Sequence, residues 1–212
     1  SRDRFFIAPS IAWRPFNGTE FNLSFEYRDE KLPFDAGLPA IDNRIVNVPI
    51  SRSFHQPGFR DKIESKLVDF NWTHQINPIF KFQNGVAAMW ADYQFRETPT
   101  AGFQTRLTAV DPFLRRGAYF ENFNRNMQTV YVNLTGEFTT WGIKHKTLLG
   151  WDYYNKETTN KGFAAFAGTD EQRDKYFTFV NVFNPVMPPL DFKELNNLRK
   201  NAPNDFGHIQ ES

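Results

Sequence analysis

Residues 20–31 read EFNLSFEYRDEK, and the alternation within them carries most of the fold prediction. Every second residue from Phe21 to Tyr27 is aliphatic or aromatic, and every residue between them is polar. Successive side chains of a β-strand point to opposite faces, so this segment predicts a strand with one apolar and one polar face. The tight-turn pair Asn17-Gly18 precedes it, which predicts a hairpin with the apolar-alternating segment 5–13.

The same alternation returns further along the chain. The six predicted strands are residues 5–13, 20–31, 67–74, 79–95, 129–138 and 145–154. In the fourth strand the aromatic residues change parity midway, and a β-bulge near Asn84 and Gly85 would account for the change. In the first strand Pro9 cannot donate a ladder hydrogen bond, so this segment is a weaker strand candidate for a soluble sheet interior.

The connections between these strands alternate strictly in length. The short ones are residues 15–19, 76–78 and 139–143, and the long ones are 32–65, 96–125 and 158 to the end. Long structureless loops are uncommon in compact soluble domains, but short turns on one rim and long loops on the other are typical of outer-membrane barrels. Ten tilted strand residues also rise roughly 25 Å, the height of such a barrel's apolar band. We therefore predict an all-β chain that forms part of an antiparallel transmembrane β-barrel with long extracellular loops.

Composition supports this prediction and excludes several other classes. Lys and Arg total 25 against 24 Asp and Glu, which gives no basic surface for nucleic acid. There is no apolar run long enough for a membrane-spanning helix. There is no cysteine, which excludes disulfides and thiolate metal sites. The 24 Phe, 7 Tyr and 5 Trp in so polar a chain suggest rings gathered on one face. Six strands cannot close a barrel, so we expect the chain to be part of a longer protein or to need further copies.

Four groups of motifs follow one another in this sequence. They are FIAPSIAWRP at 6–15; FDAGLPAI at 34–41 with VPISR at 48–52; LTGEF at 134–138 with KHKTLLGWDY at 144–153; and VFNPV at 182–186. In this order, and with these strands between them, they resemble the barrel of TonB-dependent siderophore receptors, the ferrichrome-type receptors most of all. The resemblance covers nearly the whole chain.

The resemblance implies a fold and a function. The family fold is a barrel of 22 strands closed by an N-terminal plug, and residues 1–212 look like its fourth to ninth strands, without the plug. The implied function is binding of a ferric siderophore and TonB-energised import across the bacterial outer membrane. The implied partners are the siderophore, outer-membrane lipid and lipopolysaccharide, and TonB through an N-terminal region that this chain lacks. The siderophore wraps the iron, so we expect neither a protein-bound cofactor nor a protein metal site.

Ligand contacts in such receptors come from aromatic and polar side chains of the barrel and loops. The candidates are Phe34, Phe54, His55 and Phe59 in the first long loop, and Phe103, Phe113, Arg115, Arg116, Tyr119 and Phe120 in the second. Rings offer flat apolar contact, and Arg attracts anionic chelates. The alternative is that these rings pack the loops against one another. The resemblance assigns no individual ligand residue here.

Other functions find less support in the residues. The four histidines lack the spacing of a metal site, and the motifs of hydrolases, phosphate loops and dinucleotide binding are absent, so we predict no enzyme. Glu26, Arg28 and Glu30 share a strand face and are interpreted as a charge-paired lumen wall. Residues 191–200 could form a short helix or a loop tip. A passive porin and a soluble β-sheet ligand-binding module are the alternative functions.

Overall fold

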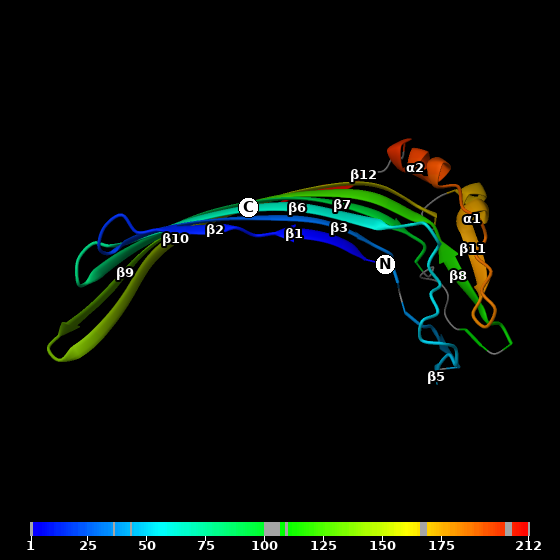
Figure 1. The fold of residues 1–212 in the computed structure, drawn as a ribbon, viewed down its shortest axis with the longest axis horizontal. Helices are drawn as coiled ribbons and strands as arrows, with labels where there is room; N and C mark the ends of the chain where they lie inside the picture. The colour runs from blue at the N-terminus through cyan, green and yellow to red at the C-terminus, as the bar shows by residue number, and fades with distance from the viewer. Residues whose placement is uncertain are drawn as a thin grey trace.

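The computed structural model describes residues 2–35, 37–42, 44–99, 107–108, 110–165 and 169–201, together with the backbone of 205–211. Its main body is one curved antiparallel sheet that is not closed (Figure 1). The strands are β1 (Asp3–Ile7), β2 (Ser10–Trp13), β3 (Thr19–Leu32), β6 (Asp61–Gln75), β7 (Phe80–Glu97), β9 (Tyr119–Thr140), β10 (Ile143–Ala164) and β12 (Asp205–Glu211). They pair in the order β1-β3-β6-β7-β9-β10-β12, with β2 also on β3. This arrangement confirms the predicted antiparallel all-β sheet that does not close by itself.

The first predicted strand is present but interrupted. β1 and β2 pair with β3 in one continuous register, in which Ile7 faces Tyr27 and Ser10 faces Ser24. Between them the carbonyl of Pro9 accepts a hydrogen bond from the Phe25 N–H at 3.0 Å. Pro9 therefore breaks the ladder because it lacks a donor, without shifting the strand.

The two faces of the sheet differ in chemistry as the alternation predicted. One face, the apolar face, carries Ile11, Trp13, Phe21, Leu23, Phe25, Phe70, Trp72, Phe82, Val86, Trp90, Val130, Val132, Leu134, Leu149, Trp151 and Tyr153. Many of these side chains are exposed, Leu149 by 73% and Trp151 by 59%. An exposed apolar surface of this extent is typical of contact with a membrane or partner.

The opposite, polar face has hydrogen-bonded and charge-paired side chains. Asn22 Nδ2 donates to Asn71 Oδ1 at 3.1 Å. Glu30 is fully buried between Arg2 and Arg28, and Arg28 Nε donates to it at 2.7 Å. This pairing agrees with the charge-paired wall expected for that face.

The prediction of a β-bulge in β7 is wrong. β7 keeps an unbroken register with β6 and with β9 past Asn84 and Gly85. The chemistry of one face changes instead, because Phe82, Val86 and Trp90 are followed on the same face by polar residues. From Phe80 to Trp90 the strand rises roughly 25 Å when tilted, about the height of a membrane's apolar band. The rest of β7 extends beyond that band.

Two rows of polar side chains continue the apolar face beyond the band. We call them the polar collar: Asp29, Glu64, Asp92 and Asn124 in one row, and Lys31, Lys62, Gln94 and Asn122 in the next. Lys62 Nζ lies 3.1 Å from Glu64 Oε2. Along this face the side chains therefore change from apolar to polar, while the pairing register of the strands stays the same.

Short turns and long loops lie at opposite ends of the sheet (Figure 1). The turn between β9 and β10 has only two residues, and both Trp141 and Gly142 have positive φ, as a tight hairpin turn requires. The strands reach further into the loops than the sequence predicted: β9 already begins at Tyr119, and β10 extends to Ala164. This extension could not be predicted because both faces of the strand ends carry polar residues. Apolar and polar residues alternate in the sequence only where one face of the strand is apolar.

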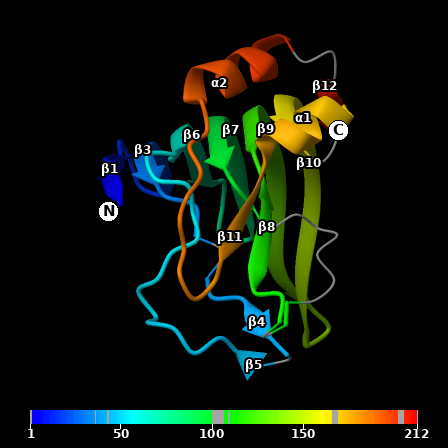
Figure 2. The same cartoon turned by 90° about the vertical axis from the view of Figure 1, so that its right-hand side faces the viewer.

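Several small elements form the loop end of the molecule (Figure 2). They are β4 (Ala40–Ile41), β5 (Arg44–Ile45), β8 (Phe113–Gly117), α1 (Asp170–Tyr176), β11 (Phe177–Asn181) and α2 (Phe192–Asn201). β4 pairs with β5, and β8 pairs with β11. α2 settles the open prediction for residues 191–200 in favour of a helix. Among the described helices, none is long and apolar enough to cross a membrane.

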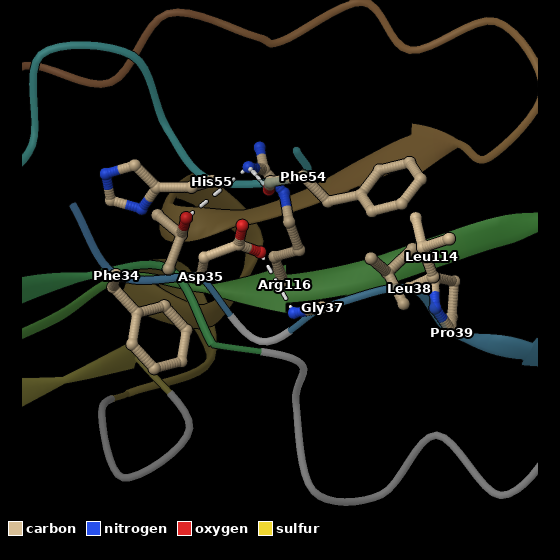
Figure 3. Close-up of a pocket in the computed structure, with 10 residues that line it drawn as sticks. Phe34, Asp35, Gly37, Leu38, Pro39, Phe54, His55, Leu114 and Arg116 are labelled. Atoms are coloured by element: carbon tan, nitrogen blue, oxygen red, sulfur yellow. Dashed lines mark hydrogen bonds between the residues drawn. The ribbon is translucent and has the colours of Figure 1, made fainter. Parts of the chain in front are cut away.

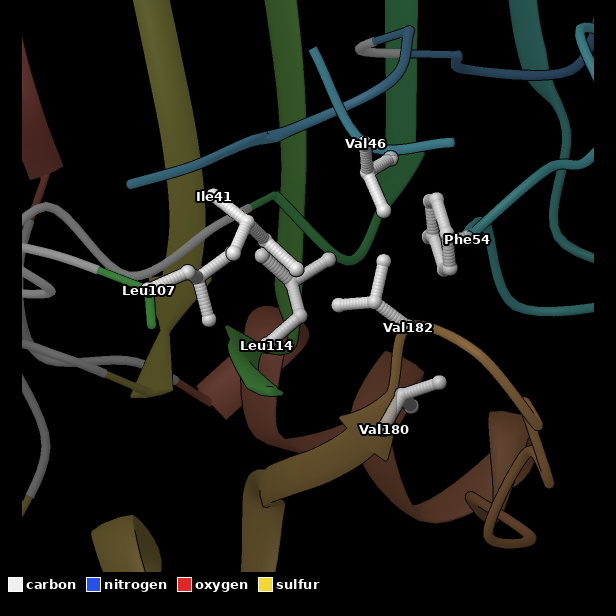
Figure 4. Close-up of a cluster of buried hydrophobic side chains, with 7 residues drawn as sticks. All are labelled: Ile41, Val46, Phe54, Leu107, Leu114, Val180 and Val182. Carbon is white, nitrogen blue, oxygen red and sulfur yellow. The ribbon is translucent and has the colours of Figure 1, made fainter. Parts of the chain in front are cut away.

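Two apolar clusters hold the three long loops together. The first consists of Ile41, Val46, Phe54, Leu107, Leu114, Val180 and Val182 (Figure 4). The second consists of Phe59, Ala118, Phe120, Phe163, Ala165, Tyr176 and Leu195. Each draws residues from all three loop regions, so the loops form one packed layer at the end of the sheet.

Candidate functional site

A small cavity lies within the packed loops, between the first and second loops (Figure 3). Its volume is about 60 Å³, and its lining residues are Phe34, Asp35, Gly37, Leu38, Pro39, Phe54, His55, Thr98, Leu114 and Arg116. Four of these ten residues are among those predicted from the sequence to contact ligand. A cavity of this size takes a small group rather than a whole chelate.

Arg116 is the buried cation of this cavity, only 1% exposed. Its Nη1 donates to the Phe54 carbonyl at 2.6 Å, and its Nη2 donates to Thr178 Oγ1 at 2.9 Å and to Gln56 Oε1 at 3.3 Å. One guanidinium from the second loop therefore binds both the first and the third loop. Burial lowers the pKa of Arg116 to about 10, so the side chain stays charged at neutral pH. The geometry makes Arg116 a residue that positions the loops.

His55 and Phe34 lie at the side of the cavity. His55 Nε2 is 2.6 Å from the Phe59 carbonyl, and the His55 ring meets the Phe34 ring edge-on at 6.4 Å between centroids. Phe34 is half-buried and lines the cavity. These two rings are placed where a ligand group entering the cavity would contact them.

Three of the predicted aromatic residues lie in the interior instead. Phe54 belongs to the first apolar cluster, and Phe59 and Phe120 belong to the second. The Phe59 and Phe120 rings are 5.2 Å apart, and both contact Phe192 of α2. Their geometry is that of loop packing, the alternative weighed in the sequence analysis. Phe103 lies outside the described residues.

Acidic groups gather where the first and second loops leave the sheet, beyond the apolar band. Asp61 Oδ1 accepts a hydrogen bond from the Arg96 backbone N–H at 2.8 Å, and its carboxyl is hydrogen-bonded to Glu97. Burial and the neighbouring Asp61 raise the pKa of Glu97 to about 8, so the pair shares a proton at neutral pH. Tyr119 donates a hydrogen bond to the nearby Glu121.

The β8–β11 sheet has a buried face and an exposed face. Leu114 and Arg116 of β8, with Thr178 and Val180 of β11, point into the packed loops. The other face carries Phe113, Arg115, Phe177 and Phe179, and we call it the aromatic face. Phe113 is 45% exposed and Phe179 is 58% exposed.

The contribution of β11 to this face was not predicted from the sequence. Phe177 and Phe179 alternate with Thr178 and Val180, which is a strand pattern. That pattern could have indicated a strand in the third loop. Its position inside a long predicted loop concealed it.

Among the described residues, no three His, Asp or Glu side chains are grouped so as to hold a metal ion. The functional features of the loop end are rings, guanidinium groups and a small cavity. These features can bind and orient a ligand.

The chain is similar to known proteins in sequence and in fold. No family model matches the chain. It is 21% identical over 169 residues to the ferrioxamine receptor of Yersinia enterocolitica, covering 78% of this chain and 23% of that protein. It is 26% identical over 152 residues to the metal-pseudopaline receptor CntO of Pseudomonas aeruginosa PAO1, covering 71% and 21%. The chain thus spans about a quarter or less of the length of these relatives.

Solved structures show the same fold. The siderophore receptor PiuA of Acinetobacter baumannii superposes with a TM-score of 0.69 at 17% identity, over 89% of this chain and 29% of that one. The open form of the ferric-catecholate import receptor Fiu of E. coli K12 gives 0.72 at 17% identity, over 89% and 30%. The open sheet with long loops at one rim therefore has the fold of a segment of these receptors.

Sequence relatives and structural neighbours together confirm the resemblance seen in the motifs. The chain is similar in sequence to receptors for ferrioxamine and metal-pseudopaline, and it shares the fold of part of two siderophore receptors. All of these proteins are receptors, which supports the prediction that the chain is not an enzyme.

Proposed function

We propose that this chain forms part of the wall and outer vestibule of a receptor that imports ferric siderophores across the bacterial outer membrane. One face of the sheet is apolar and the opposite face is polar. The three long loops pack into one layer at one end of the sheet. That combination is the observation that carries the proposal. The names of the sequence relatives, a ferrioxamine receptor and a metal-pseudopaline receptor, support the substrate class.

The proposed contact with the membrane rests on two parts of one side of the sheet, the apolar face and the polar collar. The apolar face would contact lipid tails, and the polar collar would lie at the level of lipopolysaccharide head groups. Lys31 and Lys62 would face their phosphates, and the amides of Asn122 and Asn124 could hydrogen-bond to sugars. The loops would then lie outside the cell.

The remaining partners would be contacted elsewhere in the complete receptor. Contact with TonB would be made by a region outside this chain, and a plug would face the polar wall. The ferric siderophore is the cargo, and we expect no cofactor bound by the protein itself.

The test uses the complete gene product that contains this segment. Expressed in a bacterial strain without its own siderophore receptors, it should restore uptake of radioactive iron from siderophores, and uptake should stop when TonB is deleted. Diffusion of small solutes that persists without TonB would instead identify a passive porin. Absence of the protein from outer-membrane fractions would contradict the proposal.

A further inference from the structure

Arg116 is a buried cation whose hydrogen-bond acceptors are all neutral. They are the Phe54 carbonyl, the Gln56 amide and the hydroxyl groups of Thr98 and Thr178. In the part of the chain that the structure describes, no carboxylate forms an ion pair with the guanidinium, and burial alone lowers its pKa. Buried charges in proteins are normally paired, because removing a lone charge from water is costly. The guanidinium of Arg116 therefore needs a counter-ion.

One donor of the same guanidinium has no acceptor. A guanidinium carries five N–H groups, and the two Nη atoms of Arg116 donate to the four acceptors named above. The Nε–H is buried and has no hydrogen-bond partner among the described residues. Buried donors without a partner are rare in native proteins. The unpaired charge and the unused donor thus belong to one side chain, which is 1% exposed.

The cavity that Arg116 lines has room for a small ion. Its volume is about 60 Å³, and a cavity needs about 10–15 Å³ to hold one water molecule. It can therefore hold a few water molecules or one small anion. Figure 3 shows Leu38, Pro39 and Leu114 together beside Arg116, where they make one side of the cavity apolar. An apolar wall lowers the local dielectric and strengthens the attraction between a cation and an anion.

Asp35 and His55 are the other ionisable residues that line this cavity. Asp35 is exposed, and its Oδ1 accepts a hydrogen bond from the Gly37 N–H at 2.9 Å. Gly37 has a positive φ of 78°, so the Asp35 carboxylate holds a tight turn of the first loop. His55 Nε2 lies against the Phe59 carbonyl. Neither side chain forms an ion pair or a hydrogen bond with Arg116.

We infer that this cavity binds a small monovalent anion such as chloride, and that the anion is the counter-ion of Arg116. Arg116 comes from the second loop and donates to residues of the first and third loops. An anion bound beside it would therefore stabilise the contact of all three loops. The site is separate from that of the cargo, because a ferric siderophore does not fit into a cavity of this volume. The inference does not rest on the proposed function.

The test measures hydrogen exchange of the complete gene product in detergent. Exchange at the amides of residues 54–56 and 177–180 is compared in chloride and in gluconate at equal ionic strength. Gluconate has the same charge and is too large for the cavity. When chloride is at about ten times its dissociation constant, these amides should exchange roughly tenfold more slowly than in gluconate.

Three variants locate the effect. Arg116→Met should remove the difference between chloride and gluconate, whatever its own effect on the loops. Asp35→Asn keeps an oxygen acceptor for Gly37 and removes a negative charge from the cavity, so the same protection should appear at a lower chloride concentration. The matched control is Arg173→Met, because Arg173 is an exposed cation of α1 whose Nη2 lies 2.8 Å from Asp170. That variant should respond to chloride as the unchanged protein does.

Bromide locates the site directly, because it resembles chloride and is detected by its anomalous X-ray scattering. Crystals of the complete protein grown in bromide should show a bromide ion in the cavity beside Arg116. A cavity without bromide, or equal exchange in chloride and gluconate, would overturn the inference. A chloride effect that persists in Arg116→Met would show a general salt effect instead. Loops that loosen in Asp35→Asn as much as in Arg116→Met would show that Asp35 itself is the counter-ion.

Discussion

At the scale of single residues, Gly85 leaves room for an aromatic ring of the neighbouring strand to lie against its backbone. It faces Tyr131 across β7 and β9 on the polar side of the sheet, and a Cβ atom at Gly85 would overlap the Tyr131 ring. Gly85→Ala should therefore destabilise the protein by about 1–3 kcal/mol, the usual cost of overpacking. Urea unfolding of the complete protein in lipid vesicles measures this.

A double-mutant cycle isolates the cause of this effect. In a Tyr131→Ala background the added methyl group has room, so Gly85→Ala should cost much less there. An equal cost in both backgrounds would mean that glycine acts through the backbone and not through the ring.

Arg116 gives a second residue-scale prediction. Arg116→Met keeps the length of the side chain but leaves the Phe54 carbonyl and the Thr178 hydroxyl without their donor. Local opening of the loops should become easier by on the order of 2–3 kcal/mol. Hydrogen exchange at the amides of residues 54–56 and 177–180 should accelerate accordingly. The same change at the exposed Arg173 should leave those rates as they are, and unchanged rates in Arg116→Met would contradict its positioning role.

The sequence alone could not separate exposed rings from packing rings. Phe113 and Phe120 are both aromatic residues of the second loop, yet Phe113 is 45% exposed and Phe120 is fully buried. The difference depends on which neighbours meet them, namely β11 for Phe113 and α2 for Phe120. Both neighbours come from the third loop, whose structure was not predicted apart from a possible helix.

At the scale of elements, the strands were predictable wherever one face is apolar and the other polar. β3 shows this alternation over most of its length, and its prediction was accurate. β7 shows the limit, because its outward face turns polar beyond Trp90 and the apparent change of parity suggested a bulge. The period of two persisted, and only the side chains on one face changed from apolar to polar.

Asp61 and Glu97 form a pH-sensitive pair where the first and second loops leave the sheet. The pKa of Glu97 in the folded protein lies above its ordinary value of 4.5, so its stabilising contribution is full at low pH and is lost as the pH rises toward 8. Deprotonation places two negative charges side by side at Asp61 and Glu97, with Glu121 nearby. The two loops should therefore separate more readily in alkaline solution.

Distance measurement between spin labels tests this behaviour. The chain has no cysteine, so Ser53→Cys and Asp111→Cys place one label on each loop. The distance distribution should broaden as the pH passes about 8, and Glu97→Gln should remove that dependence. Glu171→Gln on the exposed side of α1 is the control. A distribution that does not change with pH would show that the pair does not govern the loops.

At the scale of the whole molecule, the assignment of the two faces determines how the sheet sits in a membrane. Leu148 and Leu149 are neighbours on β10, 69% and 73% exposed, and they point to opposite faces. Leu149 is near the middle of the apolar stretch from Ile143 to Tyr153, and Leu148 belongs to the polar face. Because the two leucines are similarly exposed but lie on opposite faces, substitutions at these two positions can be compared directly.

Leu149→Lys should cost about 2–4 kcal/mol, because it places a charge against lipid near the midplane of the membrane. Leu148→Lys should be nearly neutral, because its side chain would face water or polar groups of the lumen. Folding of the complete protein into lipid vesicles, followed by urea titration, measures both. Equal costs for the two variants, or a larger cost for Leu148→Lys, would contradict the assignment of faces and with it the barrel-wall role of the sheet.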